Sequence, residues 1–392
     1  MDSLRTARVV SGPLAPFEAG FRAELQRTGY TPSSQRTVVA AMAQLSAWMR
    51  RAGLQPAGLS PTVLEAMPAR LRGTGPVVRF LRELGVVPAA SCVEGAGPLE
   101  VLQAQFAGWL TGERGLARET VRCYVGQSRA FLLGLGEPLD EALAALDAAT
   151  VTTFMVEYLR QLDGATAKAS VTAIRALLRF LHVAGHVPVG LAGAVPAMAG
   201  WRQASLPRGL QPGEADRLLA GCDRTTPAGR RDYAVLMMLA QLGLRGGEVA
   251  ALQMDDIDWH AGEITIRGKA ARIDRLPLPV ATGEALADYV TRGRPRCEAV
   301  AVFITLRAPH RGLTPAGVRG LVARCCARAG LPRLGAHRLR HALACDLLQA
   351  GGSLAEVGQI LRHRSALATS TYAKVDLAAL AGLVRPWPGG CR

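Results

Sequence analysis

The chain has 392 residues, of which 49% are apolar and 5% aromatic, with 46 Lys and Arg against 31 Asp and Glu. That length allows two or three domains with cores of their own, and the composition suits an Ala/Leu-rich helical protein. The formal net charge of +15 favours a polyanionic partner, nucleic acid before an anionic membrane, although coding that favours Arg would give the same surplus.

The eight cysteines include no C-x-x-C pair, which argues against a zinc site and favours reduced thiols in the cytosol. The N-terminal sequence MDSLRTARVV has no apolar signal core. The longest apolar run, 233–244, is interrupted by Gln241 and is too short to span a membrane. We therefore expect a cytoplasmic protein without a membrane partner.

Residues 1–85 are predicted to form an additional N-terminal helical module. Its apolar residues recur at helical spacing in two stripes: Phe17, Phe21 and Leu25, and then Val38, Met42, Leu45 and Met49. The following stretch, 85–98, is rich in small residues and proline and is predicted to be a linker. The sequence leaves open whether the module binds DNA, serves assembly, or does both.

Residues 99–190 are predicted to form a second helical module with basic side chains along it. Those that are candidates for contacts to phosphates are Arg118, Arg122, Lys168, Arg175 and Arg179. Arg175 and Arg179 are four residues apart, so they share one face of a helix. A solvated face without a ligand would show the same pattern. A Pro-rich stretch, 187–212, is predicted to be a second linker.

Residues 210–385 are predicted to form a mainly helical domain with a small antiparallel sheet. Helices are expected over 213–220, 231–242, 247–253, 282–290, 315–329, 337–350 and 353–361. Ser353 and Glu356 are expected to form the capping box of the last of these helices. Strands are expected over 263–266 and 275–278, which form a hairpin, and over 299–304. A short apolar helix at 377–384 is expected to dock on this domain or on a neighbouring subunit.

The stretch from His337 to Tyr372 gathers polar residues at spacings that core packing does not require. His337 and Arg340 are three residues apart and share a helix face. A second helix delivers His363, and Tyr372 follows nine residues later in a polar segment that has little apolar reason to be buried. Alone, Tyr372 is more typical of a surface tyrosine than of a nucleophile. Together, these residues indicate an anion site with a phenol nearby.

Two earlier segments add cations to this set. Arg245 lies in LGLRGGEVAAL, where Glu248 is three residues on and can hold the guanidinium. Lys269 occupies the predicted hairpin turn, where Arg267, Arg272 and Arg275 compete for its role. Each residue has an ordinary alternative, because a lone R-x-x-E is a helix-terminal ion pair and a lone turn lysine is solvated. His341 and His260 are expected to be structural, because their positions need no chemistry.

Taken in order, these residues resemble the tyrosine recombinase (phage integrase) family. The pattern is G-x-R-x-x-E-x-x-x-L, a hairpin G-K, H-x-L-R-H, a later His and T-x-x-Y. The resemblance extends over about 212–372, and much more weakly over 99–186, which is similar to that family's core-binding domain. It implies SAM-like helical N-terminal modules and an α-rich catalytic domain with a small antiparallel β-sheet.

The chain departs from the family pattern at two places. Gly246 and Gly247 follow Arg245 in place of the usual apolar or small polar pair, which would loosen the start of that helix. Arg362 stands where the family commonly has Gly before its His. There it would either add a phosphate contact or crowd the site. Neither departure removes a catalytic group.

The resemblance implies cleavage and rejoining of DNA strands through a covalent 3′-phosphotyrosine. The implied catalytic residues are Arg245, Lys269, His337, Arg340, His363 and Tyr372, the nucleophile, with Glu248 in support. Planar guanidinium groups match the non-bridging oxygens of a phosphate and stay charged. An imidazole such as His337 would take the phenol proton, and Lys269 would protonate the leaving 5′-oxygen. The residues expected to contact DNA are Arg118, Arg122, Lys168, Arg175, Arg179, Arg267 and Arg272.

The resemblance further implies a homotetramer on paired double-stranded DNA sites, acting through a Holliday junction without metal, ATP or other cofactor. Other recombinases or accessory proteins are further candidate partners, and the nucleoid is the expected location. The biological role would be the integration, excision or transposition of mobile DNA. Two alternatives stay open, a type IB-like topoisomerase and a catalytically silent DNA-binding accessory protein.

Overall fold

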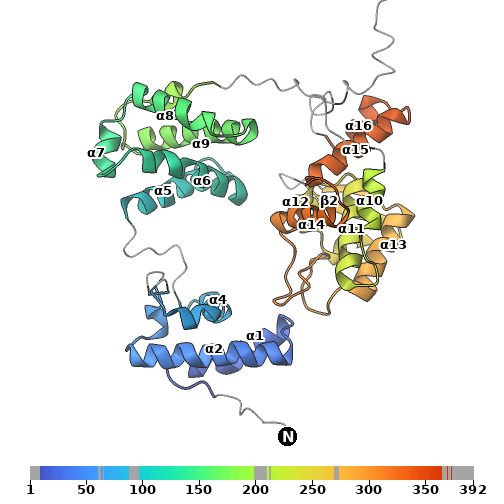
Figure 1. The fold of residues 1–392 in the computed structure, drawn as a ribbon, viewed down its shortest axis with the longest axis horizontal. Helices are drawn as coiled ribbons and strands as arrows, with labels where there is room; N and C mark the ends of the chain where they lie inside the picture. The colour runs from blue at the N-terminus through green and yellow to red at the C-terminus, as the bar shows by residue number, and fades with distance from the viewer. Residues whose placement is uncertain are drawn as a thin grey trace, which may run out of the picture. The chain divides into compact units, whose positions relative to one another are not determined.

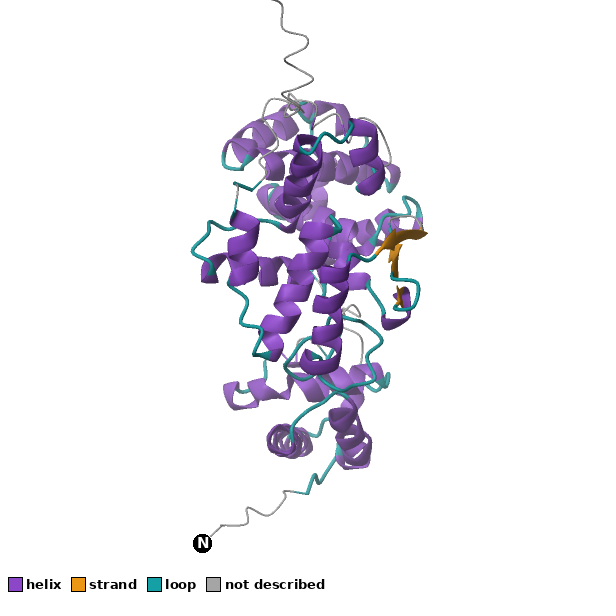
Figure 2. Ribbon diagram, turned by 90° about the vertical axis from the view of Figure 1, so that its right-hand side faces the viewer, coloured by secondary structure: helices purple, strands orange, loops and turns teal. Residues whose placement is uncertain are grey.

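A computed structural model describes residues 9–60, 63–64, 66–87, 97–197, 210–211, 213–268, 273–363, 369 and 372. Outside these residues lie Lys269, Arg272, the predicted helix at 377–384, most of the predicted linker at 85–98 and half of the one at 187–212. The chain divides into two compact units, one made of 1–52, 73–80 and 203–392, the other of 53–72 and 81–202. The domain boundaries at 1–85, 99–190 and 210–385 stay predictions. Helices make up most of the described chain (Figures 1 and 2).

The N-terminal helices are α1 (Glu18–Arg27), α2 (Pro32–Arg51) and α4 (Gly75–Glu83), with 3-10 turns at Ala15–Phe17, Pro56–Gly58 and Ala69–Thr74. The Thr31 side chain caps α2 by accepting the Ser34 N–H, and Pro32 occupies the first helical position, where its missing N–H costs nothing. The predicted apolar stripes are largely buried, although Val39 rather than Val38 faces the core of α2.

The described part of the second unit includes the helices α5 (Pro98–Gly112), α6 (Arg118–Gly134), α7 (Leu139–Ala144), α8 (Ala148–Arg160) and α9 (Gly164–Val183). A 3-10 turn, Leu191–Ala194, follows them. Aromatic side chains pack between the helices of this bundle. The ring centres of Phe106 on α5 and Phe180 on α9 are 5.5 Å apart, and Phe131 on α6 packs edge-on against Phe154 on α8. The buried apolar faces follow the helical period, which is the reason that the sequence predicts these helices.

The C-terminal helices are α10 (Glu214–Ala220), α11 (Pro227–Gln241), α12 (Gly246–Ala251), α13 (Val280–Asp288), α14 (Pro315–Arg328), α15 (Ala336–Gln349) and α16 (Leu354–Ile360). A 3-10 turn, Met254–Asp256, precedes the first strand, and a π-helical turn, Tyr289–Gly293, extends α13. Helix α11 is the central helix of the core, and its residues Ala234 to Leu239 are all nearly inaccessible to solvent. Ser353 and Glu356 form the predicted capping box at α16.

The sheet has three antiparallel strands in the order β1 (Ile257–Asp258), β2 (Glu263–Arg267) and β3 (Ile273–Pro277). The predicted hairpin is confirmed as β2 and β3, with Ile264 opposite Leu276. The predicted strand at 299–304 is wrong, since that stretch makes only isolated bridges. Its carbonyls at 299, 301 and 302 accept hydrogen bonds from the Arg294 guanidinium instead of from a neighbouring strand.

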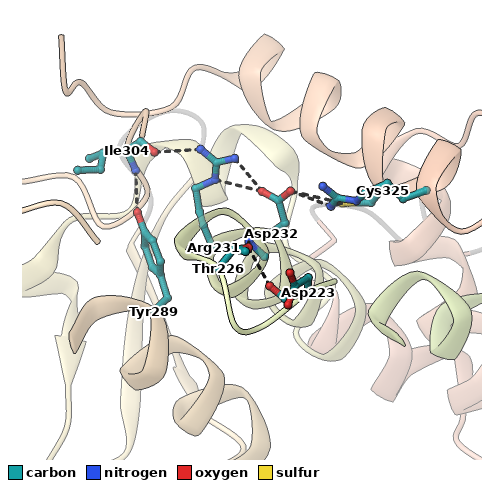
Figure 3. A network of polar contacts seen from close by, with 9 residues as sticks. Asp223, Thr226, Arg231, Asp232, Tyr289, Ile304 and Cys325 are labelled. Atoms are coloured by element: carbon teal, nitrogen blue, oxygen red, sulfur yellow. Dashed lines mark hydrogen bonds and ion pairs between the residues drawn. The ribbon is translucent and has the colours of Figure 1, made fainter. Parts of the chain in front are cut away.

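A buried ion cluster joins α11 to α14. The Asp232 carboxylate is 1% exposed and accepts from Nη2 of Arg231 at 2.8 Å and from Nη2 of Arg328 at 2.9 Å. Arg231 also donates to the carbonyl of Ile304, whose N–H donates to the Tyr289 hydroxyl (Figure 3). We call Arg231, Asp232 and Arg328 the Asp232 cluster. Its contacts tie the irregular segment before α14 to the core helix.

Candidate active site

Arg340, in the first turns of α15, is completely buried. Its guanidinium donates to the backbone carbonyls of Gly243 and Leu361, and in the described part of the chain its Nε has no hydrogen-bond partner. Burial, and next the positive charge of Arg245, lower the pKa of Arg340 to about 10. A cation in this position is costly unless an anion compensates it.

Gly243 allows the close approach of α11, α15 and α16 around Arg340. Its φ of +57° is in the left-handed region, which residues with a side chain rarely adopt. A Cβ atom at this position would lie 2.7 Å from Leu361 Cδ2 and 3.0 Å from Leu343 Cδ2. The glycine of the L-G-L-R segment is therefore required both by its backbone conformation and by the lack of space.

Glu248 is the anchor of Arg245. Its Oε1 accepts from Arg245 Nη1 at 2.7 Å, and its Oε2 accepts from the Arg245 backbone N–H at 2.9 Å, at the start of α12. Oε2 also accepts from Arg362 Nη2 at 2.8 Å. Burial opposes ionisation of Glu248, but the Arg245 N–H and the Arg362 charge outweigh it, so the pKa lies below its ordinary value. We call Arg245, Glu248 and Arg362 the Glu248 cluster.

Tyr372 is buried in an apolar cluster with Ala344, Leu348, Val357 and Leu361. This burial was not expected from the sequence, because the residues around the tyrosine are polar. The apolar side chains come instead from α15 and α16. Burial raises the pKa of the Tyr372 phenol to about 12, while the charge of Arg340 opposes the shift. The hydroxyl is therefore protonated in this structure at neutral pH.

The Tyr372 hydroxyl lies 2.6 Å from Nδ1 of His341. The His341 ring in turn packs edge-on against His337, with ring centres 4.4 Å apart. Burial and then the neighbouring His337 lower the pKa of His341 to about 4, so its ring is neutral and Nδ1 can accept the phenol proton. Burial, followed by the charges of Arg340 and Arg245, also lowers the pKa of His337.

His363 is a second histidine beside the tyrosine. Its ring is nearly parallel to that of Tyr372, with centres 6.1 Å apart, and its Nδ1 lies 2.8 Å from Oγ1 of Thr369. Burial and the charges of Arg340 and Arg245 lower its pKa to about 4. His363 is therefore a neutral hydrogen-bonding group beside the phenol.

The sequence of residues 208–378 matches the phage integrase family, and residues 104–185 match the N-terminal SAM-like domain of phage integrases. The protein y4rA of Sinorhizobium fredii, whose name gives it provisionally as an integrase/recombinase, is 38% identical over 98% of this chain and 97% of its own length. The chain belongs to the phage integrase family of tyrosine recombinases. Enzymes of this family cleave and rejoin DNA strands at specific sites through a covalent phosphotyrosine.

Other relatives of this recombinase agree with that assignment. The tyrosine recombinase XerD of Mycobacterium tuberculosis (strain H37Rv) is 30% identical over 72% of this chain and 96% of its own length. Two solved structures share the fold. The XerH recombinase bound to difH has a TM-score of 0.54 at 21% identity and covers 74% of this chain and 97% of its own. A lambda integrase dimer bound to a core site has a TM-score of 0.52 at 17% identity, and the match covers 69% of this chain and 94% of the lambda integrase chain.

The structure brings most of the predicted site residues of the recombinase into one region. Those that share it are Arg245, Glu248, His337, Arg340, His363 and Tyr372. Lys269 lies outside the described residues, so its role stays a prediction.

Among the described residues, none of the helices has both the length and the apolar composition to cross a membrane.

Sequence reasoning missed two residues of this site. His341 was expected to be structural, yet its ring contacts the hydroxyl of Tyr372. Its spacing of four residues from His337 on one helix was the available signal. Arg362 was expected to contact phosphate or crowd the site, but it forms a buried ion pair with Glu248. Only the fold shows that pair, because 114 residues separate the two partners.

The predicted DNA-contact residues of the recombinase differ in their surroundings. Arg118, Arg122, Lys168 and Arg179 are exposed on α6 and α9. Arg175 is half-buried and donates to the Val195 carbonyl at 2.9 Å, and Arg267 holds the buried Asp256 carboxylate at 2.7 Å. The last two side chains therefore have structural contacts in addition to any contact with DNA.

Proposed function

We propose that this recombinase acts on double-stranded DNA sites with Tyr372 as the nucleophile and with Arg245 and Arg340 as the phosphate clamp. The observation that carries the proposal is the buried Arg340, which bonds only to backbone carbonyls among the described residues and lies close enough to Tyr372 to affect its pKa. A phosphodiester bound here would supply the missing negative charge. Guanidinium groups would then stabilise the charge that grows on its non-bridging oxygens in the transition state.

The three histidines of the site have separate roles in this proposal, and His341, whose Nδ1 lies 2.6 Å from the Tyr372 hydroxyl, replaces His337 as the group that takes the phenol proton. As Tyr372 attacks phosphorus, its O–H bond breaks, the P–O bond forms and the proton passes to Nδ1 of His341. The pKa values of about 12 and about 4 make this transfer uphill by on the order of 10 kcal/mol before attack. The transfer must therefore accompany bond formation, which makes the phenol oxygen much less basic. His363 and His337 hydrogen-bond the phosphate and orient it.

The leaving 5′-oxygen needs a proton, and Lys269 in the β2–β3 turn is the residue that we propose to supply it. Glu248 supports Arg245. The exposed Arg118, Arg122, Lys168 and Arg179, together with Arg175, Arg267 and Arg272, would contact the DNA backbone, a kind of contact that positions a protein without reading sequence. By family resemblance, the reaction requires no cofactor.

We infer that the recombinase works as a homotetramer on two DNA sites and integrates, excises or transposes mobile DNA in the cytoplasm, at the nucleoid. A lambda integrase tetramer bound to a Holliday junction supports this assembly by its fold, with a TM-score of 0.51. Residues 1–85 would add an arm that binds DNA or the neighbouring subunit. Other recombinases or accessory proteins would join the complex at some sites.

The test uses a nicked suicide duplex that carries the recombinase's own recombination site. The wild-type chain is expected to form a covalent protein–DNA band on a denaturing gel, and Tyr372→Phe is expected to lose the band while still binding DNA. Tyr124→Phe, on α6, serves as the matched control and should keep it. A band that persists in Tyr372→Phe would assign the nucleophile elsewhere. Relaxation of supercoiled DNA without recombination would favour a topoisomerase, and binding without any band an accessory protein.

A further inference from the structure

Arg362 lies in the turn between α16 and His363, with a backbone φ of 55°. It is the only residue other than glycine with a positive φ among the described parts of the chain. Such a conformation costs energy for a residue with a side chain, and it persists where the surrounding structure holds it. The side chain is directed inward and is 5% exposed. Its contact inside the fold therefore compensates for the strained backbone.

That contact is the Glu248 carboxylate, which is 7% exposed. Arg362 Nη2 lies 2.8 Å from Oε2, and the same carboxylate holds both the side chain and the backbone N–H of Arg245. Glu248 therefore bridges two arginines that come from separate elements. One arginine begins α12, and the other immediately precedes His363.

Sharing the carboxylate changes what Arg245 can offer to a ligand. If Arg245 were the only arginine on the buried Glu248, the carboxylate would neutralise its charge. Two arginines on one carboxylate instead leave the Glu248 cluster with a net positive charge. Arg362 also fixes the orientation of Glu248 by a buried, charge-assisted hydrogen bond. The Arg245 side chain is 45% exposed, and Nη1 is its only donor with a partner among the described residues.

We propose that Arg362 is a positioning residue for recombination: through Glu248 it fixes the guanidinium of Arg245 and couples α12 to the turn that carries His363. The inference rests on the proposed function, because it requires Arg245 to bind the scissile phosphate. It assigns to Arg362 neither a phosphate contact nor a steric effect on the site.

The first measurement compares Arg362→Ala, Arg362→Gly and Arg362→Lys in single-turnover cleavage of the suicide duplex. Ala and Gly are expected to slow cleavage about 10- to 100-fold, the size of effect that a misplaced clamp produces, while the Kd for DNA changes little. Lys is expected to restore much of the rate. Gly suits the positive φ, so that variant should fold well. Arg328→Lys, in the Asp232 cluster, is the matched control and should cleave at the wild-type rate.

The second measurement asks whether Arg362 acts through Glu248. In a Glu248→Gln background, Arg362→Ala is expected to slow cleavage no further, since the two changes break the same contact. Arg362 also helps to lower the pKa of Glu248. The defect of Arg362→Ala should therefore increase as the pH falls from 8 to 5, because more Glu248 becomes protonated. A merely structural role would lower the melting temperature without these two effects.

Independent, additive effects of the two substitutions would overturn the inference. The inference would also be overturned if Arg362→Ala bound DNA more weakly and the salt dependence of its Kd decreased by about one phosphate contact. That result would mean that Arg362 contacts the DNA. Wild-type rates in Arg362→Ala, with a normal covalent band, would reject the inference and leave the proposed function standing. If the wild-type chain binds its site and forms no band, the proposed function itself fails.

Discussion

The Asp232 cluster and the Glu248 cluster are built from the same parts. In each, two arginines share one buried carboxylate. The two clusters differ in what lies next to them. Beside the Glu248 cluster is a further cation, the buried Arg340, whose guanidinium donates hydrogen bonds only to backbone carbonyls among the described residues. The Asp232 cluster stabilises the fold without a ligand. The active site accumulates positive charge that an anion must complete.

The comparison predicts that the Asp232 cluster is the more important of the two for stability. Asp232→Ala leaves Arg231 and Arg328 without their carboxylate, and breaking such a buried pair costs about 3–5 kcal/mol of unfolding free energy. Urea denaturation followed by circular dichroism measures this loss. Well below the unfolding transition, cleavage of the suicide duplex should stay near the wild-type rate. An unchanged unfolding free energy would contradict the structural role.

The second prediction concerns Arg340, whose loss should affect catalysis more than stability. Arg340→Gln removes a clamp cation, and the loss of one such donor costs about 100- to 1000-fold in rate. Single-turnover cleavage measures it. Because burial already penalises this cation, the unfolding free energy should fall by less than for Asp232→Ala. A large loss of stability with a modest loss of rate would instead make Arg340 a second structural arginine.

The third prediction is a pH dependence of stability that comes from the site histidines. His341 and His363 have folded pKa values of about 4, below the unfolded value of about 6.5. The unfolded chain therefore binds more protons between these values, and stability falls as the pH drops from about 6.5 to 4. Melting temperatures across this range should fall less steeply in His341→Gln, and less steeply again in the His341→Gln/His363→Gln double variant. An unchanged slope would contradict the neutral state of these rings.

The smallest expected effect concerns the exposed cations of the second unit. Arg179→Ala on α9 should leave the unfolding free energy within about 0.5 kcal/mol of wild type, as surface substitutions usually do. The salt dependence of the Kd for DNA should decrease by about one phosphate contact. The exposed Arg160 of α8, which is not among the predicted DNA contacts, provides a matched control as Arg160→Ala. A salt dependence unchanged by Arg179→Ala would remove this residue from the DNA contacts.

Local sequence signals were sufficient to predict much of the fold. Helical periodicity and the Ser353–Glu356 capping box gave α16 within a residue, and two alternating segments gave β2 and β3. The prediction of a strand at 299–304 was wrong. The Arg294 guanidinium donates hydrogen bonds to backbone carbonyls of this stretch, and a pattern of apolar residues carries no information about such a contact. The ordered motifs also predicted the residues Arg245, Glu248, His337, Arg340, His363 and Tyr372, which the structure brings into one region. Their catalytic roles stay predictions.

Tertiary contacts set the limit of prediction within the site. The burial of Tyr372 depends on apolar residues of α15 and α16 and not on its polar neighbours in sequence. The contact of His341 with the phenol and the pairing of Arg362 with Glu248 are long-range contacts, which no local pattern specifies. The hairpin lysine, Lys269, stays a prediction.

The central claim is that the site's surplus positive charge serves to hold a phosphate. The most direct measurement compares cleavage of a normal suicide duplex with one that carries a methylphosphonate, which is neutral, at the scissile position. On the normal phosphate, Arg340→Gln should be about 100- to 1000-fold slower than wild type. On the neutral methylphosphonate, the ratio of the wild-type cleavage rate to that of Arg340→Gln should be only a small fraction of that value. An equal gap on both substrates would contradict the account.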